Sequence, residues 1–295
     1  MKTIRKIGIL LLAAVLCGSL VGCMPLGRAI MESVEESVMD YMDAQDYTAG
    51  GFAYAAGYVN RVAVSWVGGS VTLVEGAGET LHAAESGTLS TAQQMHRRIK
   101  DGKLEIMFCA SGYIGNFPQD SKALTLEIPA GADVTVDSVS APINGSALHV
   151  GALALTTVSG AVHLDTVTAA DIAVESTSGA VSLEGETTAE ETALHTISGA
   201  VRAALLHGTS VRAETVSGGV QLGLDNCAEA DVSTVSGAVL LAVPTVHGAT
   251  FRYSTVSGSL HCDDYRVKDD TCIFGGGACD ARVSTVSGSL TVQDK

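Results

Sequence analysis

The sequence is poor in positive charge and in aromatic side chains. Its 295 residues contain 17 Lys and Arg against 32 Asp and Glu, which gives a formal net charge of −15. Nucleic-acid binding depends on a basic surface, so we expect no nucleic-acid partner. Aromatic residues make up only 4% of the chain, which leaves few rings that could form platforms for sugars.

The longest apolar run is too short to span a bilayer comfortably. It covers residues 7–16, follows three basic residues, and leads to the sequence Leu-Val-Gly before Cys23. This is the pattern of a secretory signal, and the small residues before Cys23 resemble the lipobox of bacterial lipoproteins. We therefore expect residues 1–22 to be a lipoprotein signal peptide. Lipidated Cys23 would then hold the chain on the extracytoplasmic face of the cell membrane. The alternatives are an uncleaved anchor or ordinary signal cleavage.

Residues 23–51 are predicted to form a lipid-anchored acidic helix and a linker. From Arg28 to Asp46 the apolar residues follow helical spacing, and Tyr47 to Gly51 reads as a flexible junction. The residues on the apolar face are Ile30, Val34, Val38 and Met42.

A Ser-Gly step recurs along the second half of the chain. Successive serines lie 19, 20, 19, 19, 21 and 30 residues apart, and Ser140-Ala141 is a degenerate copy 19 residues before the first. The steps are Ser159-Gly160, Ser178-Gly179, Ser198-Gly199, Ser217-Gly218, Ser236-Gly237, Ser257-Gly258 and Ser287-Gly288. A short fixed period is typical of a solenoid, in which one small unit stacks on itself.

Each period contains two strands separated by a turn. A Thr or Ser precedes the serine by two positions, a β-branched residue directly precedes it, and apolar residues alternate after the glycine. This alternation predicts strands with one buried face. The glycine would supply a backbone conformation or a close approach that a Cβ obstructs. Eight such turns, here called rungs, would form a rod of about 38 Å. The Ser-Gly column is predicted to be structural; a ligand-binding Ser/Thr track is the alternative.

Residues 52–130 lack the repeat and are predicted to be a non-repetitive β cap, with the solenoid repeats in 131–295. Two short strands around Gly68-Gly69 are expected within Val62 to Leu73. Met95 to Cys109 should form a hairpin about Asp101-Gly102, and Lys122 to Pro129 a further strand. The predicted fold is all-β: a parallel β-helix or β-solenoid of about 20-residue rungs, preceded by a short helix and this cap.

The order of these motifs resembles the DUF4097 family, the β-strand repeat proteins also called putative adhesins. The resemblance rests on Trp-Val-Gly-Gly, Leu-Thr-Leu-Glu-Ile-Pro and the repeated Thr-Val-Ser-Gly-Ala-Val units, and covers roughly residues 60 to 295. It implies a β-helical solenoid of bacterial envelope proteins, associated with surface adhesion or envelope-stress systems. It supplies no catalytic motif.

Acidic residues follow several Ser-Gly steps and could form a loose line along one edge. A Ca²⁺ site there is one reading, and solvated loop carboxylates are the favoured one. No column supplies the Arg or Lys that a uronate-cleaving enzyme requires, so we expect no enzyme, no metal and no cofactor. A polysaccharide-active enzyme is the least favoured function. The acidic residues are Asp165, Glu184, Asp225 and Asp263.

The elongated interval between the last two Ser-Gly steps contains His261, Cys262, Cys272 and Cys279. A disulfide among the three cysteines is the favoured reading for an exported protein. Free buried thiols and a zinc site are the alternatives, although a Cys-x-x-Cys pair is missing. Cys109 and Cys227 read as core residues.

The sequence thus predicts a lipid-anchored, non-enzymatic surface binding or structural protein, an adhesin or scaffold. Its partner would be an unknown envelope or surface protein. An accessory role in envelope-stress sensing is the alternative. Because the chain ends within the strand of its last rung, Leu290 to Val292, end-to-end self-association through an exposed edge is also expected.

Overall fold

The computed structural model describes residues 40–295 except 77–79, 116–121, 263–264 and 269–270. Cys23 and residues 28–39 of the expected helix lie outside the described residues. Residues 44–46, which fall within the range predicted to be helical, form a 3₁₀ turn, η1. No described helix has the length and apolar character needed to cross a membrane.

The described residues form 24 strands and two 3₁₀ helices. The elements of the first half are η1 (Ala44–Asp46), β1 (Thr48–Ala49), β2 (Phe52–Ala55), η2 (Ala56–Tyr58), β3 (Arg61–Trp66), β4 (Ser70–Glu75), β5 (Thr80–Glu85), β6 (His96–Lys100), β7 (Lys103–Met107), β8 (Ala123–Ile128), β9 (Asp133–Ser138), β10 (Ile143–His149) and β11 (Ala152–Thr157). Those of the second half are β12 (Val162–Thr168), β13 (Asp171–Ser176), β14 (Val181–Thr188), β15 (Glu191–Thr196), β16 (Val201–Thr215), β17 (Val220–Thr234), β18 (Val239–Ala242), β19 (Ala249–Thr255), β20 (Leu260–Cys262), β21 (Tyr265–Lys268), β22 (Thr271–Phe274), β23 (Cys279–Thr285) and β24 (Leu290–Gln293).

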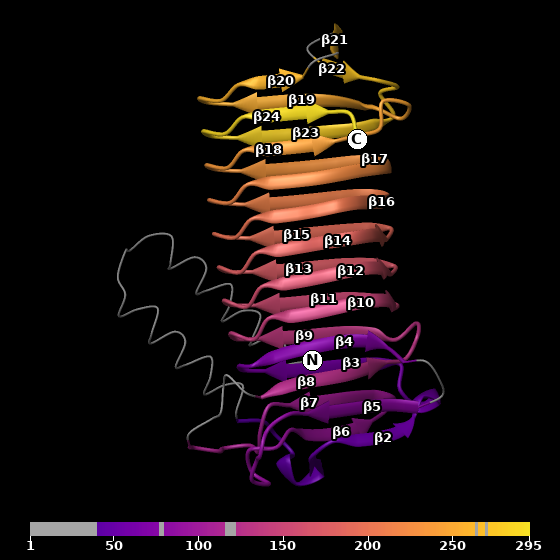
Figure 1. Cartoon of the computed structure of the whole chain (residues 1–295), viewed down its shortest axis with the longest axis vertical. Helices are drawn as coiled ribbons and strands as arrows, with labels where there is room; N and C mark the ends of the chain where they lie inside the picture. The colour runs from indigo at the N-terminus through magenta and orange to yellow at the C-terminus, as the bar shows by residue number, and fades with distance from the viewer. Residues whose placement is uncertain (1–39, 77–79, 116–121, 263–264, 269–270) are drawn as a thin grey trace.

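The strands stack into a rod with two parallel ladders, which confirms the predicted solenoid (Figure 1). Ladder A, whose strands end at the Ser-Gly corners, runs in space through β7, β3, β9, β11, β13, β15, β16, β17, β23 and β19. Ladder B, whose strands begin after the corners, runs through β8, β4, β10, β12, β14, β16, β17, β18, β24 and β20. The long strands β16 and β17 contribute to both ladders. Ten rungs in the described residues make a rod of about 48 Å.

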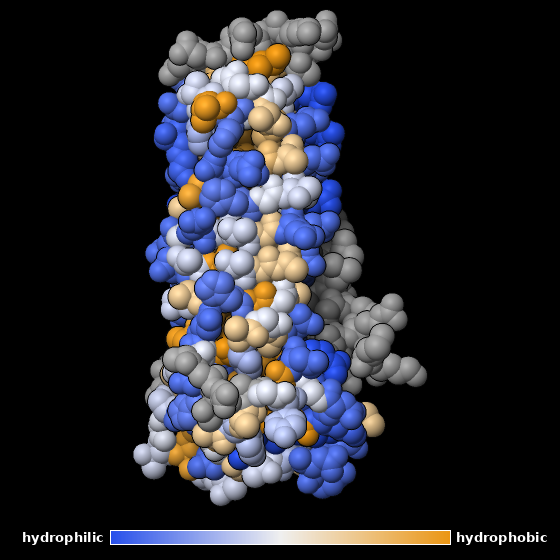
Figure 2. Space-filling view, turned by 90° about the vertical axis from the view of Figure 1, so that its right-hand side faces the viewer, coloured by the Kyte–Doolittle hydropathy of each residue, from blue (hydrophilic) through white to orange (hydrophobic). Residues whose placement is uncertain are grey.

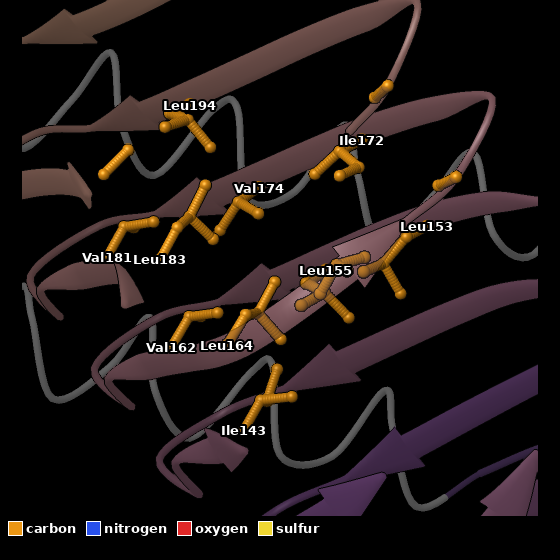
Figure 3. Close-up of a cluster of buried hydrophobic side chains, with 14 of the residues drawn as sticks. Ile143, Leu153, Leu155, Val162, Leu164, Ile172, Val174, Val181, Leu183 and Leu194 are labelled. Atoms are coloured by element: carbon orange, nitrogen blue, oxygen red, sulfur yellow. The ribbon is translucent and has the colours of Figure 1, made fainter. Parts of the chain in front are cut away.

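Alternating side chains from both ladders fill the space between them. In β11, Leu153 and Leu155 point inward and are 1% exposed; Leu155 lies beside Leu164 of β12, which is also 1% exposed (Figure 3). The same positions repeat in every rung, so one continuous apolar core runs along the rod. Burial of each such aliphatic side chain contributes about 1.5–3 kcal/mol, and stacking on neighbouring rungs is what achieves that burial.

Hydroxyl groups and glycines build each corner. The buried Thr or Ser two positions before the corner serine accepts a hydrogen bond from the glycine N–H of its own rung at 2.9–3.0 Å; the donors are Gly160, Gly179, Gly199, Gly218 and Gly237. The same hydroxyl donates to the glycine carbonyl of the preceding rung at 3.2–3.4 Å, as in Thr196, Thr215 and Thr234. The corners of Thr196, Thr215 and Thr234 therefore close themselves and also bind the neighbouring rung.

Close stacking explains why glycine recurs. A Cβ on Gly218 would lie 1.8 Å from the carbonyl oxygen of Gly199, and one on Gly179 would lie 1.9 Å from that of Gly160. Neither glycine has a positive φ. Of the two roles expected for this glycine, the close backbone approach is the one observed.

The order of the rungs in space departs from their order in sequence at both ends. Near the N-terminus, β3 lies between β7 and β9, so the rung of β3 and β4 is covered by the later rung of β7 and β8. Two rungs of the parallel ladders therefore fall within residues 52–130, where we expected only a non-repetitive cap. The strands β1, β2, β5 and β6 form antiparallel pairs beside these rungs and close that end (Figure 1).

At the C-terminal end, the last rung in sequence lies inside the stack. β23 pairs with both β17 and β19, and β24 pairs with both β18 and β20. The expectation that Leu290 to Val292 form an exposed terminal edge is therefore wrong. The outermost rung is β19 and β20, and the antiparallel hairpin β21–β22 covers the outer side of β19. This excursion accounts for the long interval between the last two Ser-Gly steps.

The N-terminal end of the core is closed by aromatic residues and a buried lysine. Trp66 occupies the corner position that Ser138 occupies in the next rung, and its ring meets Phe108 edge-on at 4.9 Å. The Lys122 ammonium group lies 4.2 Å from the centre of the Phe108 ring and forms an ion pair with Glu85 at 3.2 Å. Tyr47, placed in a flexible junction by the sequence, donates a hydrogen bond to Glu105 at 3.0 Å. The segment before β2 therefore packs on this end.

The adjacent glycines Gly218 and Gly219 allow a matched test of close stacking. We expect Gly218→Ala to destabilise the protein by about 2–3 kcal/mol, because its Cβ would overlap the carbonyl of the preceding rung. Gly219→Ala should change stability by less than about 1 kcal/mol, since its Cβ would lie 3.5 Å from the nearest atom. Urea unfolding followed by circular dichroism compares them, and equal losses would contradict the stacking argument.

Candidate binding surface

The residue directly before each corner serine forms a line along one edge of the rod. In the first two rungs that contribute to it, Val67 and Val139 are 1% exposed. In the next three rungs the equivalent side chains are half-buried: Val158, Thr177 and Ile197. In the last four rungs in space they are exposed, with Val216 at 43%, Val235 at 45%, Val286 at 47% and Val256 at 82%. We call these four side chains the valine ridge.

The valine ridge follows from the alternation of the strand. The hydroxyl two positions before the serine points inward to close the corner, so the next side chain points outward. This column was predicted from the sequence to be β-branched, but its exposure was not predicted. The alternation of buried Thr and outward Val in Thr-Val-Ser-Gly was the signal that could have revealed it.

A groove of about 430 Å³ runs beside the valine ridge and is lined by residues of five consecutive rungs, those of β15, β16, β17, β23 and β19. Exposed or half-buried serines from three neighbouring rungs, Ser233, Ser284 and Ser254, line it in a row. At one end, His195 Nδ1 lies 3.3 Å from a carboxylate oxygen of Glu214. The groove thus combines an apolar side with hydroxyl groups at the spacing of the rungs, about 4.8 Å. An elongated ligand in the groove would contact successive rungs.

The outer face of ladder A beside the groove is charged but locally balanced. Arg212 lies 3.4 Å from Asp231 on the next rung, and Arg252 lies 3.0 Å from Asp280 on its neighbour. Exposed pairs of this kind add little stability. Because these charges are paired with one another, the uncharged valine ridge is the apolar feature of this edge.

The serine hydroxyl groups of the Ser-Gly steps form hydrogen bonds with backbone carbonyl groups. Their hydroxyl groups donate to the carbonyl oxygen at the ridge position of the preceding rung in space, at 3.2–3.5 Å; the donors are Ser159, Ser178, Ser198, Ser236, Ser257 and Ser287. This geometry fits the structural role expected for them. The hydroxyl groups that face the groove come instead from the row of Ser233, Ser284 and Ser254.

The expected acidic line is only partly assembled. Asp165 and Glu184 lie on neighbouring rungs, directly after the paired residues Leu164 and Leu183. Asp225 instead pairs with His247 at 2.8 Å, and Asp263 lies outside the described residues. In the part of the chain that the structure describes, no three His, Cys, Asp or Glu side chains converge in a way that could hold a metal ion.

The cysteines of the elongated interval are separated. Cys272 in β22 and Cys279 in β23 lie on opposite sides of β19, about 10 Å apart by strand spacing, which is too far for a disulfide. Cys262 belongs to ladder B. No disulfide joins cysteines among the described residues. The cysteine beside Cys279 is Cys227, and both line a cavity of about 610 Å³ together with His207 and His247.

The column of outward side chains that includes Glu214 continues down the rod through Glu175 and Thr156 to Asp137. Burial raises the pKa of Asp137 to about 6, and the nearby Glu175 carboxylate adds to the rise. The hydrogen bond with Thr156 acts in the opposite direction. One carboxyl group of this face therefore titrates near neutral pH.

Figure 2 shows another side of the rod, where polar and small residues dominate and apolar ones are scattered.

The comparison with protein families agrees with the fold. The family model described as Toastrack DUF4097 matches residues 59–293. The chain is similar to a solved structure described as a putative cell adhesion protein from Clostridium sporogenes, with 8% identity, a TM-score of 0.29, and coverage of 84% of this chain and 100% of that one. It is also similar to one described as a putative adhesin from Bacteroides fragilis, with 14% identity, a TM-score of 0.46, and coverage of 83% and 96%. No curated protein matches. Neither structural likeness is close enough to transfer a function.

The raised pKa of Asp137 predicts a pH-dependent stability difference. A carboxyl group with a raised pKa in the folded state favours folding while it is protonated, and this contribution is lost as pH rises from about 4 through about 6. We expect Asp137→Asn to be more stable than wild type by about 1–2 kcal/mol near pH 8, and not near pH 4. Thermal unfolding at both pH values tests this. The exposed Asp171, two rungs away, provides the control Asp171→Asn, and a pH-independent effect of Asp137→Asn would contradict the argument.

Proposed function

The chain belongs to the Toastrack DUF4097 family, and from this premise we propose that it is a non-enzymatic surface binding protein. In this proposal, Cys23 carries the lipid that holds the rod on the extracytoplasmic face of the membrane. The valine ridge and its groove bind an extended segment of another envelope or surface protein. The observation that carries the proposal is the exposure of four aligned valines, 43–82%, beside a groove that spans five rungs.

Exposed apolar groups in one line favour an interaction site. Single exposed apolar residues are ordinary on protein surfaces, whereas contiguous ones mark places where another molecule covers them. Val216, Val235, Val286 and Val256 occupy consecutive rungs in space. A polypeptide strand that lies along the rod could bury all four and reach the hydroxyl groups of Ser233, Ser284 and Ser254.

The rigidity of the corners supports binding without a large ordering cost. The backbone that presents the valine ridge is fixed by hydrogen bonds within each corner and between corners, for example from Gly218 to Thr215 at 3.0 Å and from Thr215 to Gly199 at 3.2 Å. A preorganised surface loses little conformational entropy when a partner binds. Binding energy from a modest apolar contact is then retained.

Charge supports a protein partner and a lipid tether. The formal net charge of −15 repels nucleic acid and anionic headgroups, so adsorption of the rod to a membrane by electrostatics is unfavourable. A diacylated cysteine would supply durable attachment that charge cannot. The proposal therefore assigns membrane attachment to Cys23 and recognition to the rod.

The lipid anchor has a direct test. When the full chain is expressed in a bacterium, we expect it to fractionate with membranes and to carry a diacylglyceryl group on Cys23. Cys23→Ser should move it to the soluble fraction, with the β-sheet signal in circular dichroism unchanged. Fractionation and mass spectrometry provide the readout. A Cys23→Ser variant that stays with the membrane fraction would refute the anchor without touching the proposed groove.

The groove is tested by photocrosslinking on intact cells with a photoreactive residue in place of Ser254. We expect capture of an envelope or surface protein, and we expect the double variant Val235→Lys and Val286→Lys to reduce capture by about tenfold or more, because two charges would replace the centre of the apolar contact. The matched control is Val246→Lys, since Val246 is 79% exposed but does not line the groove.

The captured proteins separate the alternatives. Surface proteins of the same or a neighbouring cell support adhesion, and membrane kinases or their accessory proteins support envelope-stress sensing. Equal capture by the double variant and by wild type would reject the valine ridge as the contact surface.

A further inference from the structure

Two cysteines far apart in sequence lie on neighbouring strands near the C-terminal end of the rod. Cys227 lies within β17, and Cys279 is the first residue of β23, the inserted strand that pairs with β17. The register places Glu229 opposite Asp280. Counting back along both strands sets Ala228 opposite Cys279, so Cys227 is one residue away on the diagonal.

This arrangement has the dimensions of a disulfide. Strands lie about 4.8 Å apart and rise about 3.3 Å per residue, which puts the two Cα atoms about 6 Å from each other. Cα atoms joined by disulfides are usually 4.4–6.8 Å apart, most often near 6 Å. Both side chains point inward, with Cys227 6% and Cys279 3% exposed, and the two thiols are close enough to form a hydrogen bond with each other.

The thiols are buried but reachable. Both line the 610 Å³ cavity, which His207, His247 and Gly248 also border. Small molecules can therefore approach the sulfur atoms from the side of the cavity. Cys109, by contrast, is 1% exposed at the other end of the core and does not line this cavity.

We propose that Cys227 and Cys279 form a redox-dependent disulfide that fastens the inserted C-terminal rung to the body of the solenoid. When the thiols are reduced, only non-covalent contacts hold β23 between β17 and β19. The disulfide adds a covalent link across the junction between β17 and β23, where the order of rungs departs from the order of the sequence.

The chemistry is thiol–disulfide exchange with a small-molecule disulfide as the oxidant. The thiolate of Cys227 attacks one sulfur of the oxidant, which releases one thiolate and leaves a mixed disulfide. The Cys279 thiol then loses its proton, and its sulfur attacks Cys227 Sγ and releases the second thiolate. The two protein thiols are oxidised, and one small disulfide is reduced to two thiols.

The local environment favours Cys227 as the attacking group. The hydrogen bond from Cys279 lowers the pKa of the Cys227 thiol, although burial opposes this effect. The same contact, together with burial, raises the pKa of the Cys279 thiol. A thiol with more thiolate character reacts first with an external disulfide, which leaves Cys279 to close the bond.

The test uses the full chain, purified under reducing conditions and then equilibrated with oxidised glutathione. Peptide mapping without reduction should recover the peptides of Cys227 and Cys279 joined. Oxidation should slow hydrogen exchange in β23 and β24 by about tenfold or more. It should also raise the melting temperature of the C-terminal end by roughly 5–10 °C, and reductant should reverse both effects.

Serine variants define the pair and the order of attack. Cys227→Ser and Cys279→Ser should each abolish the crosslink, whereas the control Cys109→Ser should retain it. Cys279→Ser should accumulate glutathione on Cys227 about ten times faster than Cys227→Ser accumulates it on Cys279. Recovery of both residues as free thiols after oxidation of the wild type, or as a disulfide with Cys262 or Cys272, would overturn the proposal. The mapping of the wild type decides the matter even where a variant folds poorly.

Discussion

The close contact between glycine backbones at successive corners is the constraint on which the rest of the structure depends. It brings the carbonyl of one rung to within van der Waals distance of the next glycine, so no other residue fits without a shift. The buried hydroxyl three positions before the glycine then satisfies polar groups of both rungs, as Thr215 does for Gly218 and Gly199. Because that hydroxyl must point inward, the next residue must point outward, and the valine ridge is the consequence. Packing, register and the exposed surface thus have one origin in Thr-Val-Ser-Gly.

A Thr-Val-Ser-Gly corner forms hydrogen bonds to a neighbouring rung. At the two ends of the rod, where a neighbour is missing on one side, other side chains take over. At the N-terminal end, aromatic residues occupy the corner position: Trp66 stands where Ser138 stands in the next rung, and its ring packs on Phe108. The buried ammonium group of Lys122 closes the core over both rings. At the C-terminal end, the Tyr253 hydroxyl donates to the Gly288 carbonyl at 2.6 Å, which is the acceptor that a corner threonine would otherwise use. The hydroxyls of Thr255 and Thr285 there are buried without a hydrogen-bond partner.

The sequence predicted the middle of the rod well because each rung there repeats the same local solution. The period, the alternation around Ser178 or Ser198 and the glycine column were sufficient to derive parallel two-stranded rungs. Rungs whose corners carry other residues were missed, since Trp66-Val67-Gly68-Gly69 lacks the hydroxyl that marks the repeat. The order of the end rungs could not be derived at all. It depends on which strand pairs with β17 and β18, and β19 and β23 offer nearly the same pattern. The adjacency of Cys227 and Cys279 follows only from that order, so spacing alone could not reveal it.

The two inversions have unlike consequences for assembly. At the N-terminal end, the rung of β3 and β4 is made first, and later rungs can add to both of its sides. At the C-terminal end, β23 and β24 are made last and must enter between rungs that precede them in sequence. In the final arrangement the rung of β19 and β20 joins the ladders only through β23 and β24. A solenoid ordinarily gains stability one rung at a time, but here the last two rungs must form together.

The groove along the valine ridge spans this junction, because Val216 and Val235 belong to the body while Val286 and Val256 belong to the two interleaved rungs. The apolar line is thus continuous only when the insertion has occurred, which makes the binding surface a property of the completed C-terminal end.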